Sequence, residues 1–201
     1  MDIIQIYTLV TGILYIVLEI RQKNLMWAVG VLTSVGAMYV FFQKGAYASF
    51  GLNTYYLIMS FWGIYQWRKA KTRASEISSE TGQEGLHLNR MSWKTAATSA
   101  VIVLAGTWGL VELMDFLKEA GMQENPMSHL DASVTMLSAV ATWWLARSYI
   151  QQWWLWIAAD FMTALMCAGH QAWPMVILYG AYSLSAIYGY VYWKRHGIYL
   201  D

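Results

Sequence analysis

Asp160 is the side chain best placed to do chemistry in this sequence, because it is the only charge in a long apolar stretch. Helical spacing of i, i+3 and i+7 puts Trp153, Trp156 and Asp160 on one stripe, two indoles beside a carboxylate. A carboxylate at bilayer depth is costly and marks a candidate functional site, here one for a cation. The alternative is that Asp160 is a helix-packing residue bonded to a hydroxyl, and that the tryptophans form an interfacial belt.

Two other apolar stretches carry polar and aromatic side chains at helical spacing. Asn53, Tyr56 and Ser60 follow the i, i+3, i+7 pattern, and Tyr179 and Tyr182 lie one turn apart near the C-terminus. We predict that these side chains line the same substrate site as Asp160. For each serine and tyrosine the alternative is ordinary packing between helices.

The remaining acidic candidates lie close to the ends of apolar stretches. Tyr7, Thr11, Tyr15 and Glu19 recur at spacings of four, and Asp131 begins a later stretch. Because of these terminal positions, we expect Glu19 and Asp131 to face water.

The composition is that of a membrane protein. Of 201 residues, 58% are hydrophobic, 16% aromatic and only 12% charged, about half the charged share of a soluble domain. The single cysteine, Cys167, excludes an internal disulfide and a multi-cysteine metal site. The net charge of +1 predicts no nucleic-acid partner. The sequence lacks G-x-S-x-G, H-E-x-x-H and a phosphate-binding glycine loop, so we expect neither an enzyme, nor a cofactor, nor a metal site.

Apolar stretches separated by polar residues predict an all-α membrane protein with seven transmembrane helices. The predicted spans are 3–20, 25–43, 46–67, 94–116, 130–149, 153–169 and 174–193. With the N-terminus outside and the C-terminus inside, all but Lys44 and Lys118 of the 13 basic residues are cytoplasmic. His87, His129 and His196 are expected to be solvated.

The predicted organisation divides the chain into two halves of three helices. It comprises a first three-helix bundle (1–67), a polar cytoplasmic linker (68–92), a connecting transmembrane helix (93–117), an outer loop (118–129), a second three-helix bundle (130–193) and a cytoplasmic tail (194–201). Gly63 and Trp67 form a G-x-x-x-W match to Gly189 and Trp193, and Arg21 corresponds to Arg147. These matches predict 3+1+3 parallel repeats.

The sequence resembles the PnuC vitamin transporters. The similarity covers nearly the whole chain except the linker and the fourth span, and its most specific part is the W-x-x-W-x-x-x-[N/D] pattern ending at Asp160. It rests further on Tyr47-Ala48-Ser49, Asn53, Trp62 to Trp67, Asp131-Ala132-Ser133 and Arg147-Ser148-Tyr149. The resemblance implies a full-length SWEET-like fold, a homotrimer in the bacterial inner membrane, and facilitated diffusion of an unphosphorylated vitamin that a cytoplasmic kinase traps.

Three positions depart from the nicotinamide riboside carriers of that family. Those carriers usually have Asn where this chain has Asp160, Gln where it has Asn53, and a further Asn where it has Ser60. A carboxylate suits the aminopyrimidine and the fixed positive charge of thiamine, whereas side-chain amides suit a carboxamide. These departures resemble the thiamine-carrying PnuT branch, so the sequence favours thiamine, with nicotinamide riboside as the alternative.

The predicted mechanism is that of a uniporter. Trp153 and Trp156, together with tyrosines of the last span, would hold a flat cationic ring by stacking and cation–π attraction. Asp160 and Asn53 would fix the edge of the ring, while one bundle rocks against the other. A proton-coupled carrier in which Asp160 titrates, a membrane enzyme and an assembly subunit remain as rival hypotheses.

Overall fold

The computed structural model describes the backbone of residues 3–43, 47–81, 85–121 and 129–200, and the side chains from residue 12 onward within those ranges except at 48, 80 and 81. The predicted outer loop falls largely outside these residues, as do the side chains of Tyr7 and Thr11. The elements are α1 (Ile3–Ile20), α2 (Leu25–Gln43), α3 (Tyr47–Thr81), β1 (Leu86–Leu88), α4 (Trp93–Glu119), α5 (His129–Ala146), α6 (Gln152–Gly169), α7 (Trp173–His196) and β2 (Gly197–Tyr199).

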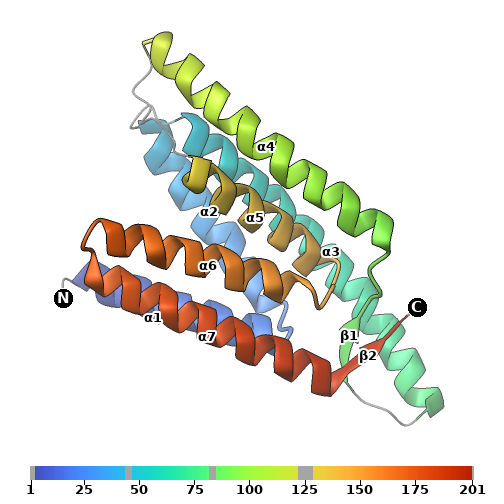
Figure 1. The fold of residues 1–201 in the computed structure, drawn as a ribbon. Helices are drawn as coiled ribbons and strands as arrows, with labels where there is room; N and C mark the ends of the chain where they lie inside the picture. Colours follow the sequence, from blue (N-terminus) through green and yellow to red (C-terminus); the bar gives the residue numbers. More distant parts are fainter. Residues whose placement is uncertain (1–2, 44–46, 82–84, 122–128, 201) are drawn as a thin grey trace.

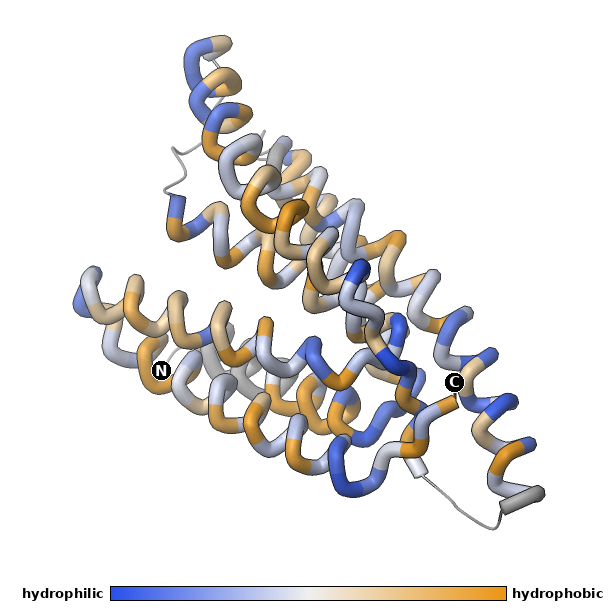
Figure 2. The backbone as a smooth tube through the Cα atoms, turned by 45° about the vertical axis from the view of Figure 1, so that its right-hand side comes forward, coloured by the Kyte–Doolittle hydropathy of each residue, from blue (hydrophilic) through white to orange (hydrophobic). Residues whose placement is uncertain are grey.

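The helix boundaries follow local signals in the sequence. Ser92 caps α4 by accepting the Thr95 N–H at 3.1 Å, and Pro174 occupies the first turn of α7, where a missing N–H costs nothing. By length and apolar composition, α2, α4 and α7 are able to cross a membrane. Hydrophobic positions recur along the helices and alternate with more polar ones (Figure 2). All seven expected helices are present, but three of them meet this criterion of length and composition in the described part of the chain, so seven membrane spans stay a prediction.

The helices form two groups that diverge toward the end carrying the N-terminus and converge near the strands (Figure 1). One group contains α1, α6 and α7, and the other contains α2, α3, α4 and α5. α1 packs against α7 as well as α2, and α5 packs against α3, α4 and α6. Contacts of α1 with α7 and of α5 with α3 thus join the segments that the sequence assigned to separate bundles.

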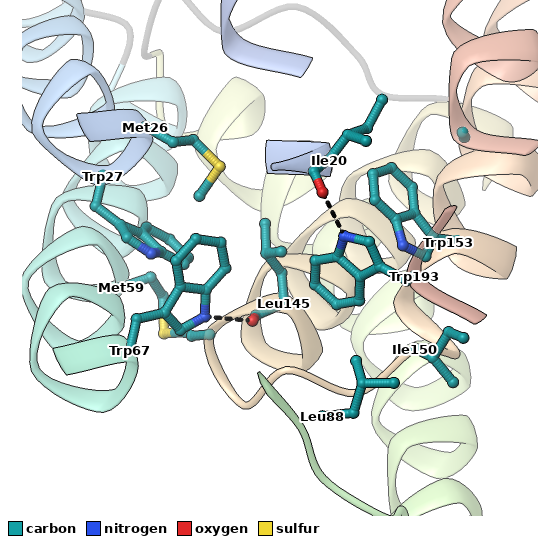
Figure 3. Close-up of a cluster of buried hydrophobic side chains, with 12 residues drawn as sticks. Ile20, Met26, Trp27, Met59, Trp67, Leu88, Leu145, Ile150, Trp153 and Trp193 are labelled. Carbon is teal, nitrogen blue, oxygen red and sulfur yellow. Dashed lines mark hydrogen bonds between the residues drawn. The ribbon is translucent and has the colours of Figure 1, made fainter. Parts of the chain in front are cut away.

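Two tryptophan pairs form the centre of the hydrophobic core (Figure 3). Trp27 of α2 meets Trp67 of α3 edge to face with ring centroids 5.3 Å apart, and Trp153 of α6 meets Trp193 of α7 in the same way at 5.4 Å. Gly63 lies against the Trp27 ring and Gly189 against the Trp153 ring, so a Cβ at either glycine would overlap the indole. The two G-x-x-x-W sequences therefore make equivalent helix contacts.

The turns after α1 and α5 have the same backbone geometry. Gln22 and Ser148 both adopt positive φ, 47° and 57°. The Gln22 N–H donates to the Glu19 carbonyl at 3.0 Å, and the Ser148 N–H donates to the Leu145 carbonyl at 2.9 Å. Each turn lets the next helix begin within a few residues, antiparallel to the one before.

The predicted solvated linker is wrong in part. α3 continues to Thr81, well beyond the expected end at 67, because the segment after Trp67 is rich in helix-forming Lys, Ala, Arg and Glu. Leu86–Leu88 then pairs in parallel with Gly197–Tyr199, so the end of the linker and the tail form a two-stranded sheet. Leu88 is 1% exposed, and its burial explains why the strand docks.

His87 is buried, contrary to the expectation of a solvated histidine. Its backbone N–H donates to Oε1 of Gln22 at 3.0 Å, its carbonyl accepts Nε2 of Gln22 at 3.0 Å, and its Nδ1 lies 2.8 Å from Oγ of Ser148. We call β1, β2, Gln22 and Ser148 the strand clasp, and the end of the molecule where it lies the clasp end. The clasp holds the turns after α1 and α5 together. His129 and His196 are exposed, as expected.

Candidate functional site

Asp160 lies half-buried on α6 where it faces α1 and α7. It is near enough to Tyr179 and Tyr182 of α7, and to Glu19 of α1, to interact with them electrostatically. Tyr179 and Tyr182 pack edge to face with centroids 5.9 Å apart. The Tyr182 hydroxyl lies over Gly12 of α1, where a Cβ would leave it no room. The structure thus brings three predicted site residues together.

Glu19 is a candidate site residue, although its place near a helix end predicted that it faces water. Its side chain is 3% exposed, because the turn after α1 is bonded to β1 through Gln22 and His87 and the first residue of α6, Gln152, lies beside it. The Gln152 side chain, 0% exposed, lies beside the carboxyl. Within the described residues, Oε1 of Glu19 and the Gln152 amide have no partner at regular hydrogen-bond geometry. A buried carboxyl with unused acceptor capacity is costly unless something polar or cationic meets it.

Tyrosines extend the site from α1 to α3. Tyr15, one turn before Glu19, interacts electrostatically with both Glu19 and Tyr56. Tyr56 packs edge to face on Tyr55 at 5.6 Å, and the Tyr55 hydroxyl donates to the Ala139 carbonyl of α5 at 2.7 Å. Tyr56 therefore lies on the site side of α3, held by a neighbour that anchors α3 to α5.

Asn53 and Ser60 are each bonded to their own helix. Nδ2 of Asn53 donates to the Ser49 carbonyl at 2.9 Å, and the side chain remains half-buried. Oγ of Ser60 donates to the Tyr56 carbonyl at 2.8 Å and sits against Gly30 of α2, 4% exposed. Ser60 packs between α2 and α3 in this structure, so its place in the site stays a prediction that its contacts do not support.

The three tryptophans at the start of α6 have different roles. Trp153 is 2% exposed and packs in the core against Trp193 and Gly189, so its stacking on a ligand stays a prediction that this arrangement does not support. Trp154 is 55% exposed on the outer surface. Trp156 is half-buried one turn from Asp160, and its Nε1 is buried without a partner in the described part of the chain. Trp156 is the indole that remains a candidate for stacking.

The residues that sequence reasoning missed are Tyr15, Glu19 and Gln152. The four-residue spacing of Tyr15 and Glu19 was a signal, but nearness to a helix end argued against it. Two carboxyls, several tyrosine rings and one indole can bind a flat cation through charge and ring faces. In the described ranges, no three His, Cys, Asp or Glu side chains cluster closely enough to hold a metal ion.

Comparison with known proteins places this chain in a family. A family model described as nicotinamide mononucleotide transporter matches residues 2–195. A protein of Neisseria mucosa named nicotinamide riboside transporter PnuC is 26% identical over 198 residues, covering 93% of this chain and 72% of that protein. A protein of the same name from Haemophilus influenzae is 25% identical over 187 residues, covering 92% and 76%.

A solved structure has the same fold. The crystal structure of the vitamin B3 transporter PnuC matches with a TM-score of 0.65 at 22% identity, covering 94% of this chain and 81% of that one. At 22% identity this match supports a shared fold and nothing further. Because the family model spans almost the whole sequence, the chain belongs to the nicotinamide mononucleotide transporter family.

Proposed function

We propose that this protein is a membrane carrier that takes up an unphosphorylated, positively charged vitamin, with nicotinamide riboside as the first candidate. The observation that carries the proposal is the grouping of Glu19, Asp160, Tyr179 and Tyr182 between α1, α6 and α7. The names of the two relatives support nicotinamide riboside ahead of thiamine, which the sequence alone favoured.

In the proposed binding mode the carboxyls meet the positive charge of the pyridinium ring. Trp156, Tyr179 and Tyr182 offer ring faces, each cation–π contact contributing on the order of 0.5–2 kcal/mol. The half-buried Asn53 would bind the carboxamide edge through its carbonyl oxygen, since its amide N–H group already bonds to α3. Access would alternate when one three-helix repeat, α1 to α3, rocks against the other, α5 to α7, as in other repeat-built transporters.

Thiamine is the second candidate, and one residue favours it. Asp160 stands where the nicotinamide riboside carriers usually have an asparagine, and a carboxylate can accept from both an aminopyrimidine amino group and a protonated ring nitrogen. The same carboxylate also attracts a pyridinium. The carboxylate of Asp160 therefore gives only a small preference for thiamine over nicotinamide riboside.

The parallel 3+1+3 repeat is part of the proposal. It is supported by the matched turns at Gln22 and Ser148 and by the two edge-to-face tryptophan pairs, which recur at a constant separation along the chain. The basic residues support an outer N-terminus and a cytoplasmic clasp end. Location in a bacterial inner membrane, assembly as a homotrimer and trapping of the vitamin by a cytoplasmic kinase belong to the same proposal.

We propose that the protein carries the vitamin across the membrane without changing it chemically. Calorimetric titration of the purified protein with nicotinamide riboside and then with thiamine tests the substrate. Asp160→Ala should abolish binding, whereas Asp115→Ala, an exposed carboxylate on α4, should leave the Kd within twofold. Equal binding by the wild type and Asp160→Ala would remove Asp160 from the site, and no saturable binding of either vitamin would contradict the proposal.

Uptake into vesicles that contain the protein and no kinase tests the mechanism. A uniporter equilibrates the vitamin across the membrane and is insensitive to an uncoupler. Uptake that an uncoupler abolishes would instead support the proton-coupled carrier, for which two neighbouring carboxyls would be suitable groups. Chemical change of the vitamin by the purified protein would establish the enzyme hypothesis.

A further inference from the structure

A polar cavity of about 270 Å³ lies at the clasp end, outside the candidate substrate site. Lys69 and Arg73, on successive turns of the α3 extension, form one wall, and Arg147 and Tyr149 from the turn after α5 form another. Asn89, directly after β1, also lines it. Three cationic side chains face this cavity, and no carboxylate is among its lining residues in the described ranges.

Arg147 is held in place by its neighbours. Its guanidinium lies over the rings of Trp62 and Trp143, 5.8 and 5.6 Å from their centroids, and Nη1 donates to the Tyr149 hydroxyl at 3.2 Å. Its carbonyl accepts Nδ2 of Asn89 at 2.7 Å. Stacking on aromatic rings fixes the plane of the guanidinium while leaving most of its five N–H donors for another acceptor.

The turn after α1 shows that a basic residue at the clasp end need not be held in place by its neighbours. Arg21 follows α1 as Arg147 follows α5, yet Arg21 is exposed to solvent whereas Arg147 is half-buried. An excess of positive charge on one side of a membrane protein is expected and needs only solvated side chains. Charge asymmetry across the membrane does not require the aromatic rings that hold the Arg147 guanidinium, nor the cavity beside it.

We propose that this cavity is a binding site for a phosphate-bearing anion. A guanidinium binds phosphate oxygens through two parallel N–H bonds, and lysine adds a point charge. The anion would join the α3 extension, the turn after α5 and the segment after β1, so that its binding stabilises the converged clasp end. Its source is either a soluble phosphate compound, such as a phosphorylated nucleoside, or the headgroup of an anionic lipid.

The test uses the full-length protein and two double variants matched in charge. Lys69→Gln with Arg73→Gln removes two cations from the cavity, and Arg68→Gln with Lys71→Gln removes two exposed cations of the same helix that do not line it. Inorganic phosphate and nicotinamide mononucleotide are titrated separately into the detergent-purified proteins at low ionic strength. We expect saturable binding that weakens at least tenfold in the cavity variant and less than twofold in the control.

Two further arms identify the source and separate this site from the substrate site. For a lipid headgroup, nanodiscs containing phosphatidylglycerol raise the melting temperature of the wild type above that in phosphatidylcholine, and the cavity variant loses this gain. Asp160→Ala should leave anion binding unchanged, so failure of the proposed vitamin site does not affect the result. The proposal is overturned if none of the three phosphate sources binds or stabilises the protein, or if both double variants weaken binding equally.

Discussion

Trp193 donates a hydrogen bond of 3.0 Å from its indole Nε1 to the backbone carbonyl of Ile20, 173 residues away in the sequence. Trp67 makes the matching bond, 3.1 Å long, to the carbonyl of Leu145. Each tryptophan ends one G-x-x-x-W sequence and bonds to the last turn of a helix in the other half of the chain (Figure 3). The two halves are therefore tied crosswise, α7 to α1 and α3 to α5, close to the clasp end.

Removing either indole donor should destabilise the protein. Trp193→Phe leaves a buried carbonyl at the end of α1 without its side-chain donor, which costs about 1–3 kcal/mol of unfolding free energy. Trp67→Phe should cost less, because the Leu145 carbonyl also accepts the Ser148 N–H at 2.9 Å. Thermal unfolding in detergent measures both, with the 76% exposed Trp93→Phe as control. A Trp193→Phe variant as stable as the control would contradict the tie.

Adding one methyl group at Gly63 or Gly189 should have the opposite effect from adding it elsewhere on the same helices. Gly63→Ala and Gly189→Ala force a Cβ into the Trp27 or Trp153 ring, and overpacking of this kind typically costs about 1–3 kcal/mol.

The controls for these variants lie on the same helices. Gly51→Ala on α3 and Gly180→Ala on α7 meet nothing within 4 Å and should be neutral or stabilising by up to about 1 kcal/mol, as alanine favours the helix. The melting temperatures of the four variants, each compared with the wild type, measure these effects. Equal effects within each pair would show that the indoles move aside without cost.

The stability of the protein should fall in mild acid because of His87. Burial lowers the pKa of His87 from 6.5 to about 4, and the nearby Lys71 adds to the lowering. Between pH 6.5 and 4 the unfolded chain binds a proton that the folded protein does not, so stability decreases as the pH falls through this window. Protonation of His87 thus lowers the free energy of unfolding by at most about 3 kcal/mol, since one pKa unit corresponds to about 1.36 kcal/mol.

A comparison of two histidine variants isolates this effect. Melting temperatures at pH 7.5 and 4.5 should differ less for His87→Gln than for the wild type, whereas His196→Gln, at an exposed position, should keep the wild-type difference. Identical pH dependence in His87→Gln and the wild type would show that His87 titrates normally.

Asp160→Asn should change the choice between vitamins. An amide loses the charge that attracts the cationic ring of either vitamin, but it matches the carboxamide of nicotinamide riboside in donor and acceptor pattern, and this match offsets the loss for that vitamin alone. We expect the ratio of the Kd of thiamine to that of nicotinamide riboside to rise at least tenfold, measured by titration of purified protein. Asp115→Asn is the matched control on α4. An unchanged ratio would mean that Asp160 does not contact the ring that distinguishes the two vitamins.

The helices and the pairing of similar motifs were predictable from the sequence. Apolar stretches of suitable length, ended by short polar segments, predict the observed helix ends within a few residues except at the end of α3, because the run of apolar side chains is a local property. Helical spacing likewise named Asp160 and the tyrosines of α7 as candidates, and the structure places them near one another. The helix-forming residues after Trp67 were a local signal for the α3 extension. The Ser, Gly and charged residues of the whole segment 68–92 also fit a solvated loop, so composition did not decide between the two.

Only the tertiary structure decided what the remaining residues do. Burial of Glu19, Trp153 and His87 depends on segments far away in sequence, as in the bond between Gln22 and His87 across 65 residues. A residue near a helix end is expected in water until another element covers it, and neighbouring indoles on a helix differ by about 100° in direction. The sequence by itself determined which segments become helices and which motifs repeat. Long-range packing determined which side chains face the site and which fill the core.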